Sequence, residues 1–113
     1  MANPQLESGY TEIANEFLEA VIKTSMSDYE HRIFWLIIRK TYGFKKKSDW
    51  ISNKQISSET GILKQHVSRT IKRLLEKNMI LREEKKLSIQ KDYELWKLPK
   101  QVTDKSNPNR LLK

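Results

Sequence analysis

The sequence has 113 residues, enough for one domain with a single hydrophobic core. It contains no cysteine, which excludes disulfides, thiolate chemistry and zinc-finger ligation, and 37% of its residues are hydrophobic, as in a small globular domain. The longest apolar run, residues 33–38, is too short to cross a bilayer, and the first ten residues lack the pattern of a secretory signal. We therefore expect a cytoplasmic protein that does not associate with a membrane.

The net charge of +8 is distributed very unevenly along the chain. Residues 1–31 contain six acidic residues and one basic residue, whereas residues 32–113 contain 21 basic and eight acidic residues. This segregation favours a polyanionic partner for the later part of the chain. A lysine-rich solvated surface would give the same totals, so the positions of the cations have to decide between the two interpretations.

The first part of the chain is expected to be an arm followed by an acidic helix. Residues 1–9 are expected to form a flexible N-terminal arm. From Tyr10 onward apolar residues recur at helical spacing, with Phe17 and Val21 on one side and glutamates on the other. The pattern predicts an amphipathic helix that begins at Tyr10.

The second helix is expected at the centre of the core. Ser27 followed by Glu30 is a capping-box signature, in which each side chain satisfies a free amide of the first helical turn. Residues 28–42 are apolar around most of the helix circumference. Gly43 is expected to end this helix by adopting a positive φ.

A basic loop and two further helices follow. Residues 44–52 contain three consecutive lysines and end in a short extended piece around Trp50. Ser52 with Gln55 is a second capping-box signature, which predicts a third helix that runs to Thr60 and stops at Gly61. The fourth helix is expected over residues 64–77, so only a three-residue turn separates it from the third, as in a helix-turn-helix.

The end of the domain is expected to contain a small sheet. Residues 79–90 show strand patterns on both sides of the turn "EKK" and predict a β-hairpin. Residues 92–99 fit either a further strand or a helical turn. The element order predicts a mainly α fold with a small β-hairpin, a winged helix-turn-helix over residues 10–98, with residues 99–113 as a polar C-terminal tail or the start of a linker.

The fourth helix has one apolar and one cationic side. At about 100° per residue, Ile71 and Leu74 lie in a stripe around Val67, which is the expected core side. The opposite side suits a recognition helix in a DNA groove, with early residues at base edges and later cations at phosphates. An ordinary solvated helix face has the same periodicity. The residues expected to contact bases are Gln65, His66, Ser68 and Arg69, of which Arg69 suits guanine and Gln65 suits adenine.

Cations outside the first turns of this helix are expected to contact phosphates. They lie in the lysine loop, at two helix starts, on the fourth helix and on the hairpin, or wing. Two glutamates next to the hairpin turn would repel phosphates, so the sequence leaves open whether the wing contacts DNA. The expected phosphate contacts are Lys45, Lys46, Lys47, Lys54, Lys64, Lys72, Arg73, Arg82, Lys85 and Lys86.

Several stretches resemble the N-terminal, origin-binding domain of the phage replication protein O family, the lambda O-like proteins. They are "GYTEIANEFLEA", "IIRKTYGFKKKSDWIS" and "TGILKQHVSRTIKRLLEKNMI". The sequence "RKTYG" followed by a basic loop and "D-x-I-[ST]" is the most specific element, and "IQKDYELWKL" resembles the family ending "INKDYxxW". The resemblance covers residues 9–98.

The resemblance implies a winged-helix domain that binds double-stranded DNA at repeats of a phage or prophage replication origin, in a bacterial host cell. It also implies a homodimer on inversely symmetric sites. Family members bring in a helicase or helicase loader through a separate C-terminal region, which we do not expect within these 113 residues.

An enzyme is not expected, and neither is a metal site or a cofactor. The two histidines, His31 and His66, are far apart in the sequence and have no metal-ligand spacing. The glutamates of the first helix fit a solvated face better than a metal site. Two alternatives to an origin-binding initiator remain: a winged-helix transcriptional regulator, which the fold alone does not separate from an initiator, and a protein–protein adaptor, which would leave the cationic helix face unexplained.

Overall fold

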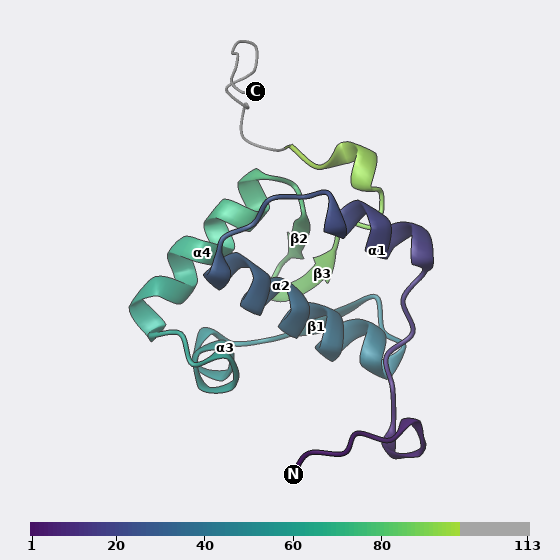
Figure 1. Ribbon diagram of the computed structural model, residues 1–113. Helices are drawn as coiled ribbons and strands as arrows, with labels where there is room; N and C mark the ends of the chain where they lie inside the picture. Colours follow the sequence, from purple (N-terminus) through teal and green to yellow (C-terminus); the bar gives the residue numbers. More distant parts are fainter. Residues whose placement is uncertain (98–113) are drawn as a thin grey trace, which may run out of the picture.

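The computed structural model describes residues 1–97, which form four α-helices and a small antiparallel sheet (Figure 1). The mainly helical composition and the hairpin were both expected from the sequence. The predictions for residues 98–113 lie outside the described residues. In chain order the elements are α1 (Asn15–Ile22), α2 (Asp28–Thr41), β1 (Ser48–Trp50), α3 (Asn53–Thr60), α4 (Lys64–Glu76), β2 (Ile80–Glu83) and β3 (Lys86–Ile89). Single 3-10 turns occur at Leu6–Ser8, Tyr42–Phe44 and Tyr93–Leu95.

The prediction that the first helix begins at Tyr10 is wrong, because α1 begins at Asn15. Residues 10–14 alternate between exposed and partly buried side chains, which is the pattern of an extended segment. This alternation already brings Ile13 against the core.

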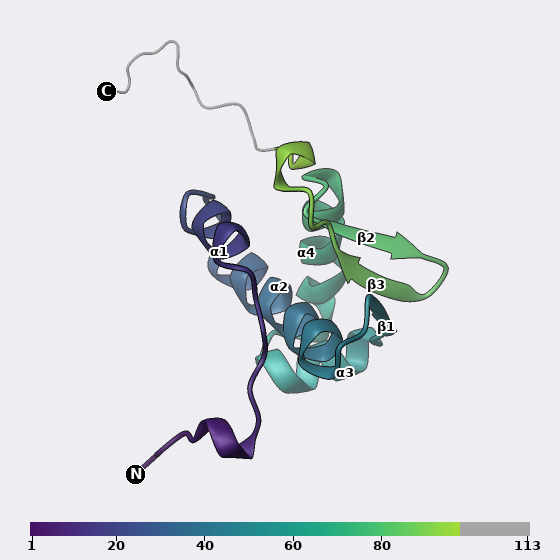
Figure 2. The ribbon, with the colours of Figure 1, turned by 90° about the vertical axis from the view of Figure 1, so that its right-hand side faces the viewer.

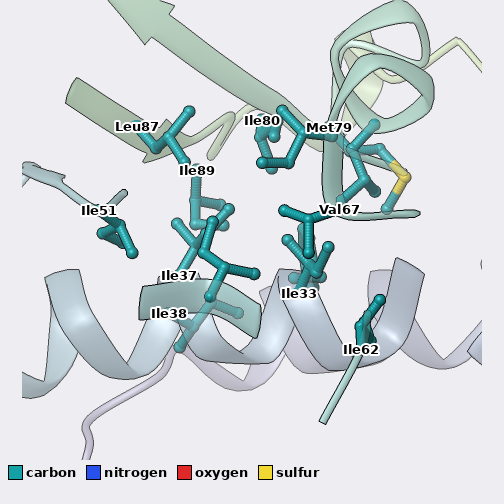
Figure 3. Close-up of a cluster of buried hydrophobic side chains, with 14 of the residues drawn as sticks. Ile33, Ile37, Ile38, Ile51, Ile62, Val67, Met79, Ile80, Leu87 and Ile89 are labelled. Carbon is teal, nitrogen blue, oxygen red and sulfur yellow. The ribbon is translucent and has the colours of Figure 1, made fainter. Parts of the chain in front are cut away.

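Helix α2 is the centre of the core, as predicted. The capping box at its start is complete: the Glu30 amide donates to the Ser27 hydroxyl at 3.2 Å, and the Ser27 amide donates to Glu30 Oε1 at 3.0 Å. The side chains of Ile33 and Ile37 are fully buried, and Figure 3 shows them facing residues of α4 and of the sheet. Both neighbours therefore take their orientation from α2.

The prediction that Gly43 ends α2 through a positive φ is also wrong. Gly43 lies in the 3-10 turn that follows α2, and the left-handed residue is Lys45, with φ 57°. A Cβ on Gly43 would lie 2.6 Å from Nη1 of Arg39 and 3.2 Å from the Thr11 hydroxyl. Glycine is needed here for close approach of neighbouring groups rather than for its backbone angle.

Helices α3 and α4 are joined by a three-residue turn, and their bounds agree with the predicted ones to within one residue. Ser52 accepts a hydrogen bond from the Gln55 amide at 3.1 Å, but the Gln55 side chain donates to Glu59, so the second capping box is only half formed. Gly61 has φ 80° and closes α3, as expected.

The sheet has three strands in the order β1-β3-β2, all antiparallel. The predicted hairpin is confirmed, and Figure 2 shows it extending past the helices. The extended piece around Trp50 forms the third strand by pairing with β3, with Ser48 opposite Ser88 and Trp50 opposite Lys86. This pairing joins segments on either side of the two-helix unit.

The segment after the sheet forms a helical turn at Tyr93–Leu95, which decides between the two alternatives. Trp96 then packs edge-on against Phe17 of α1 and Phe34 of α2, with ring centroids 5.6 and 6.0 Å apart. In residues 1–97 no helix has the length and apolar character needed to span a membrane.

We expect Gly61→Ala to destabilise the domain by about 1–2 kcal/mol, because a Cβ disfavours the left-handed conformation. The space around Gly61 is open, with the nearest atom 3.8 Å from an added Cβ, so the backbone angle alone should cause the loss. Urea unfolding measures the change. Gly61→Asn is the control and should lose less, since asparagine tolerates this conformation; equal losses for the two variants would contradict the explanation.

Candidate nucleic-acid interface

The outer side of α4 presents an uncovered polar and cationic surface. Gln65, Arg69 and Lys72 are exposed, whereas Val67 and Ile71 of the same helix are buried against the core. Within residues 1–97, the charged groups of Arg69 and Lys72 form no ion pair and are available to a ligand, and the uncharged Gln65 side chain is exposed beside them. The periodicity of the sequence therefore predicted this surface correctly. We call these three residues the α4 outer face.

The other two expected base contacts have partners within the protein. The His66 ring is partly buried and lies 5.9 Å from the Tyr29 ring of α2. Ser68 is exposed, but its hydroxyl accepts a hydrogen bond from Nδ2 of Asn53 at 2.8 Å. Asn53 was not singled out from the sequence, although its position directly after the helix cap would place it beside the next helix.

Arg73 lies on a different side of α4 from the outer face. Its guanidinium approaches Oε2 of Glu30 at 3.3 Å, and Lys77 Nζ reaches Oε1 of the same carboxylate at 2.7 Å. Relative to Val67, His66, Arg73 and Lys77 lie at about 240–280° around the helix. This side of α4 packs against the start of α2. It is therefore partly covered, although its residues lie outside the apolar stripe around Val67.

The Glu30 carboxylate holds α2 and α4 together. It is only 3% exposed, and burial alone would raise its pKa. Hydrogen bonds from Lys77, the Ser27 amide and Arg73, together with the charge of Lys77, outweigh this effect and lower the pKa below 4.5. The carboxylate therefore stays ionised and anchors Arg73 of α4 and Lys77, which directly follows α4.

The remaining expected phosphate contacts are all exposed, and they occupy three places. Lys54 and Lys64 lie in the first turns of α3 and α4. Lys46 already has partners within the protein: its ammonium lies 3.4 Å from Asp49 Oδ1 and 6.0 Å from the centre of the Phe44 ring. The other exposed cations in the lysine loop and on the hairpin are Lys45, Lys47, Arg82, Lys85 and Lys86.

The described part of the chain contains no group of three or more histidine, aspartate or glutamate side chains placed to hold a metal ion. Its chemistry is that of cations and hydrogen-bonding groups on rigid helices. Such groups can bind phosphates and read base edges.

The profile of the family described as bacteriophage replication protein O matches residues 2–96. The chain belongs to this family. It is 32% identical over 93 residues to DNA replication protein gp18 of Salmonella phage P22, covering 82% of this chain and 34% of the relative. It is 33% identical over 107 residues to replication protein 15 of Enterobacteria phage phi80, covering 91% and 35% of the two chains.

A further member, replication protein O of Escherichia phage lambda, is 27% identical over 94 residues, which cover 83% of this chain and 28% of that protein. The chain thus spans about a third of the length of the curated relatives it matches. No solved structure matches the chain. Membership in a phage DNA replication family agrees with the resemblance seen in the sequence motifs.

The lowered pKa of Glu30 predicts a specific acid sensitivity. The carboxylate stabilises the folded state above its unfolded pKa, and this contribution is lost as the pH falls through the lower folded pKa. We expect Glu30→Gln to cost about 1–3 kcal/mol at neutral pH, the range for hydrogen bonds to charged groups, and to flatten the loss of stability below about pH 5.

Unfolding by urea at a series of pH values measures both effects. Asp28→Asn is the matched control, because Asp28 forms an exposed ion pair with Arg32 one turn along the same helix. That variant should keep the wild-type decline in acid. A Glu30→Gln protein with an undiminished acid decline would show that another group is responsible.

Proposed function

We propose that the chain is a winged helix-turn-helix domain that binds double-stranded DNA sequence-specifically at repeats of a phage or prophage replication origin, and that it takes part in starting DNA replication. Helix α4 is the recognition helix in this proposal, α3 is the helix that precedes it, and the β2–β3 hairpin is the wing. The observation that carries the proposal is the exposed, unpaired α4 outer face on a helix whose opposite side is buried.

In this proposal Arg69 and Gln65 read base edges in the major groove, and Lys72 contacts a phosphate farther along α4. Ser68 acts together with Asn53, since their hydrogen bond joins the starts of the two helices. Glu76 lies on the same side as Arg69 at the end of α4 and limits the cationic sector to the earlier turns.

The residues proposed to contact phosphates lie on elements next to the α4 outer face. Lys54 and Lys64 lie at helix starts, where free amides also favour an anion, and the lysine loop and the wing add further cations. Arg73 and His66 contribute indirectly, because their contacts with α2 set the angle of α4. Family membership supports extending the proposal to a homodimer on inverted half-sites and to helicase recruitment through a region other than this domain.

Substitutions on α4 should separate the two kinds of contact. Arg69→Ala should lower the preference for the specific site over random duplex by about 1–3 kcal/mol, because it removes a base contact. Lys72→Ala should weaken binding to both duplexes alike and reduce the slope of affinity against salt by about one. Titration of both duplexes at several salt concentrations measures these effects. Equal losses on both duplexes for the two variants would contradict the assigned roles.

The biological target can be identified by selecting genomic DNA fragments with the purified protein and sequencing them. We expect short, inversely repeated sites clustered near replication genes of a phage or prophage. Scattered promoter sites would instead indicate a transcriptional regulator. The Arg69→Ala protein is the control and should lose the enrichment.

A further inference from the structure

The outer face of the sheet carries an exposed tryptophan that duplex binding by α4 does not use. Side chains alternate along a strand, and the inner-face residues Ile80, Leu87 and Ile89 are buried. The register therefore places Trp50, Lys86 and Glu83 in one row of the outer face, and Ser48, Ser88 and Leu81 in the next row, about 7 Å away. The Trp50 side chain is 61% exposed, and Leu81 is 39% exposed.

A pocket of about 360 Å³ lies beside these rows, where β1 begins and β3 ends. Its lining includes Lys46, Lys47 and Lys91, together with Leu81 of the outer face. Tyr42 also lines it, and in the part of the chain that the structure describes the buried Tyr42 hydroxyl makes no hydrogen bond. None of the lining residues comes from α3 or α4.

A second exposed aromatic side chain continues this surface. The Phe44 ring is exposed, with the Arg39 guanidinium 4.8 Å and the Lys46 ammonium 6.0 Å from its centre. Lys46 in turn lines the pocket. Five lysines (Lys45, Lys46, Lys47, Lys86 and Lys91) lie in or beside this surface, and the acids next to them are Asp49, Glu83, Glu84 and Asp92. The surface is thus cationic as well as aromatic.

Exposed aromatic rings among cations match the chemistry of a single strand of nucleic acid. Its unpaired bases can stack on aromatic side chains while its phosphates lie against lysines. A duplex keeps its base faces inside the stack, so it can use the lysines but not the ring of Trp50. We propose that the outer face of the sheet and the adjoining lysine loop bind single-stranded DNA, with one base stacked on Trp50 and phosphates at Lys47 and Lys91.

This surface is separate from the α4 outer face, so the proposal does not depend on duplex recognition by Arg69. It gives the domain two modes of binding, one for paired DNA at α4 and one for an unpaired strand at the sheet. The lysines next to the sheet can serve both modes, whereas the ring of Trp50 serves only the second.

The test measures binding of a fluorescent oligothymidine of about 12 nucleotides, a length within the range of single-strand sites, by anisotropy. We expect Trp50→Ala to weaken this binding about 5- to 100-fold, as for loss of one stacked base, and to change affinity for duplex less than twofold. Arg69→Ala should show the opposite pattern, losing specific duplex affinity and keeping oligothymidine binding. Each variant is first checked for an unchanged melting temperature.

Trp50→Phe is the matched variant, because it keeps an aromatic ring. It should retain most of the oligothymidine affinity but lose the quenching of tryptophan fluorescence on binding, since Trp35 and Trp96 are partly buried in the core. Absence of oligothymidine binding by the wild-type chain would overturn the proposal. Equal weakening of single-strand and duplex binding by Trp50→Ala would overturn it as well.

Discussion

The burial of α2 on nearly all sides is the constraint on which the rest of the structure depends. Ile33, Phe34 and Ile37 are fully buried, and α4, α3 and the sheet all pack against this one helix. Removing such side chains from water provides most of the stabilisation of a domain this small. The angle between the α4 outer face and the sheet is therefore set by how each element packs on α2.

Polar contacts at the start of α2 complement this apolar packing. Glu30 takes part in the capping box and also binds Arg73 and Lys77, so one buried carboxylate fixes the helix start and the last turns of α4. Arg32 adds a hydrogen bond to the Thr60 carbonyl at the end of α3. Such contacts restrict the helices to one arrangement, as a binding surface on α4 requires.

Local signals in the sequence predicted most of the fold. Capping residues located the starts of α2 and α3, Gly61 marked the turn before α4, and apolar periodicity identified the buried and exposed sides of α4. The start of α1 was predicted too early because residues 10–14 are extended, and their alternating apolar residues partly match the spacing expected of a helix. Gly43 was misread because its role depends on Arg39 and Thr11 rather than on its own backbone angle.

Non-local contacts account for the remaining differences at the candidate site. Arg73 and Glu30 are 43 residues apart in sequence, so a helical projection of α4 alone could not show that the start of α2 covers Arg73. The same holds for the Tyr29 ring beside His66 and for the pairing of β1 with β3, which sets Trp50 on the outer face of the sheet. The exposed positions of Gln65, Arg69 and Lys72 needed only local periodicity.

The pairing of β1 with β3 closes a long loop of the chain between Ser48 and Ser88, and this loop contains α3 and α4. Because both ends of this loop are held by the β1–β3 ladder, we expect a large displacement of α3 or α4 to require loss of that pairing. We therefore expect α3 and α4 to open together with the β1–β3 ladder rather than one by one. In the proposed complex, fitting would therefore come from deformation of the duplex rather than from movement of α4.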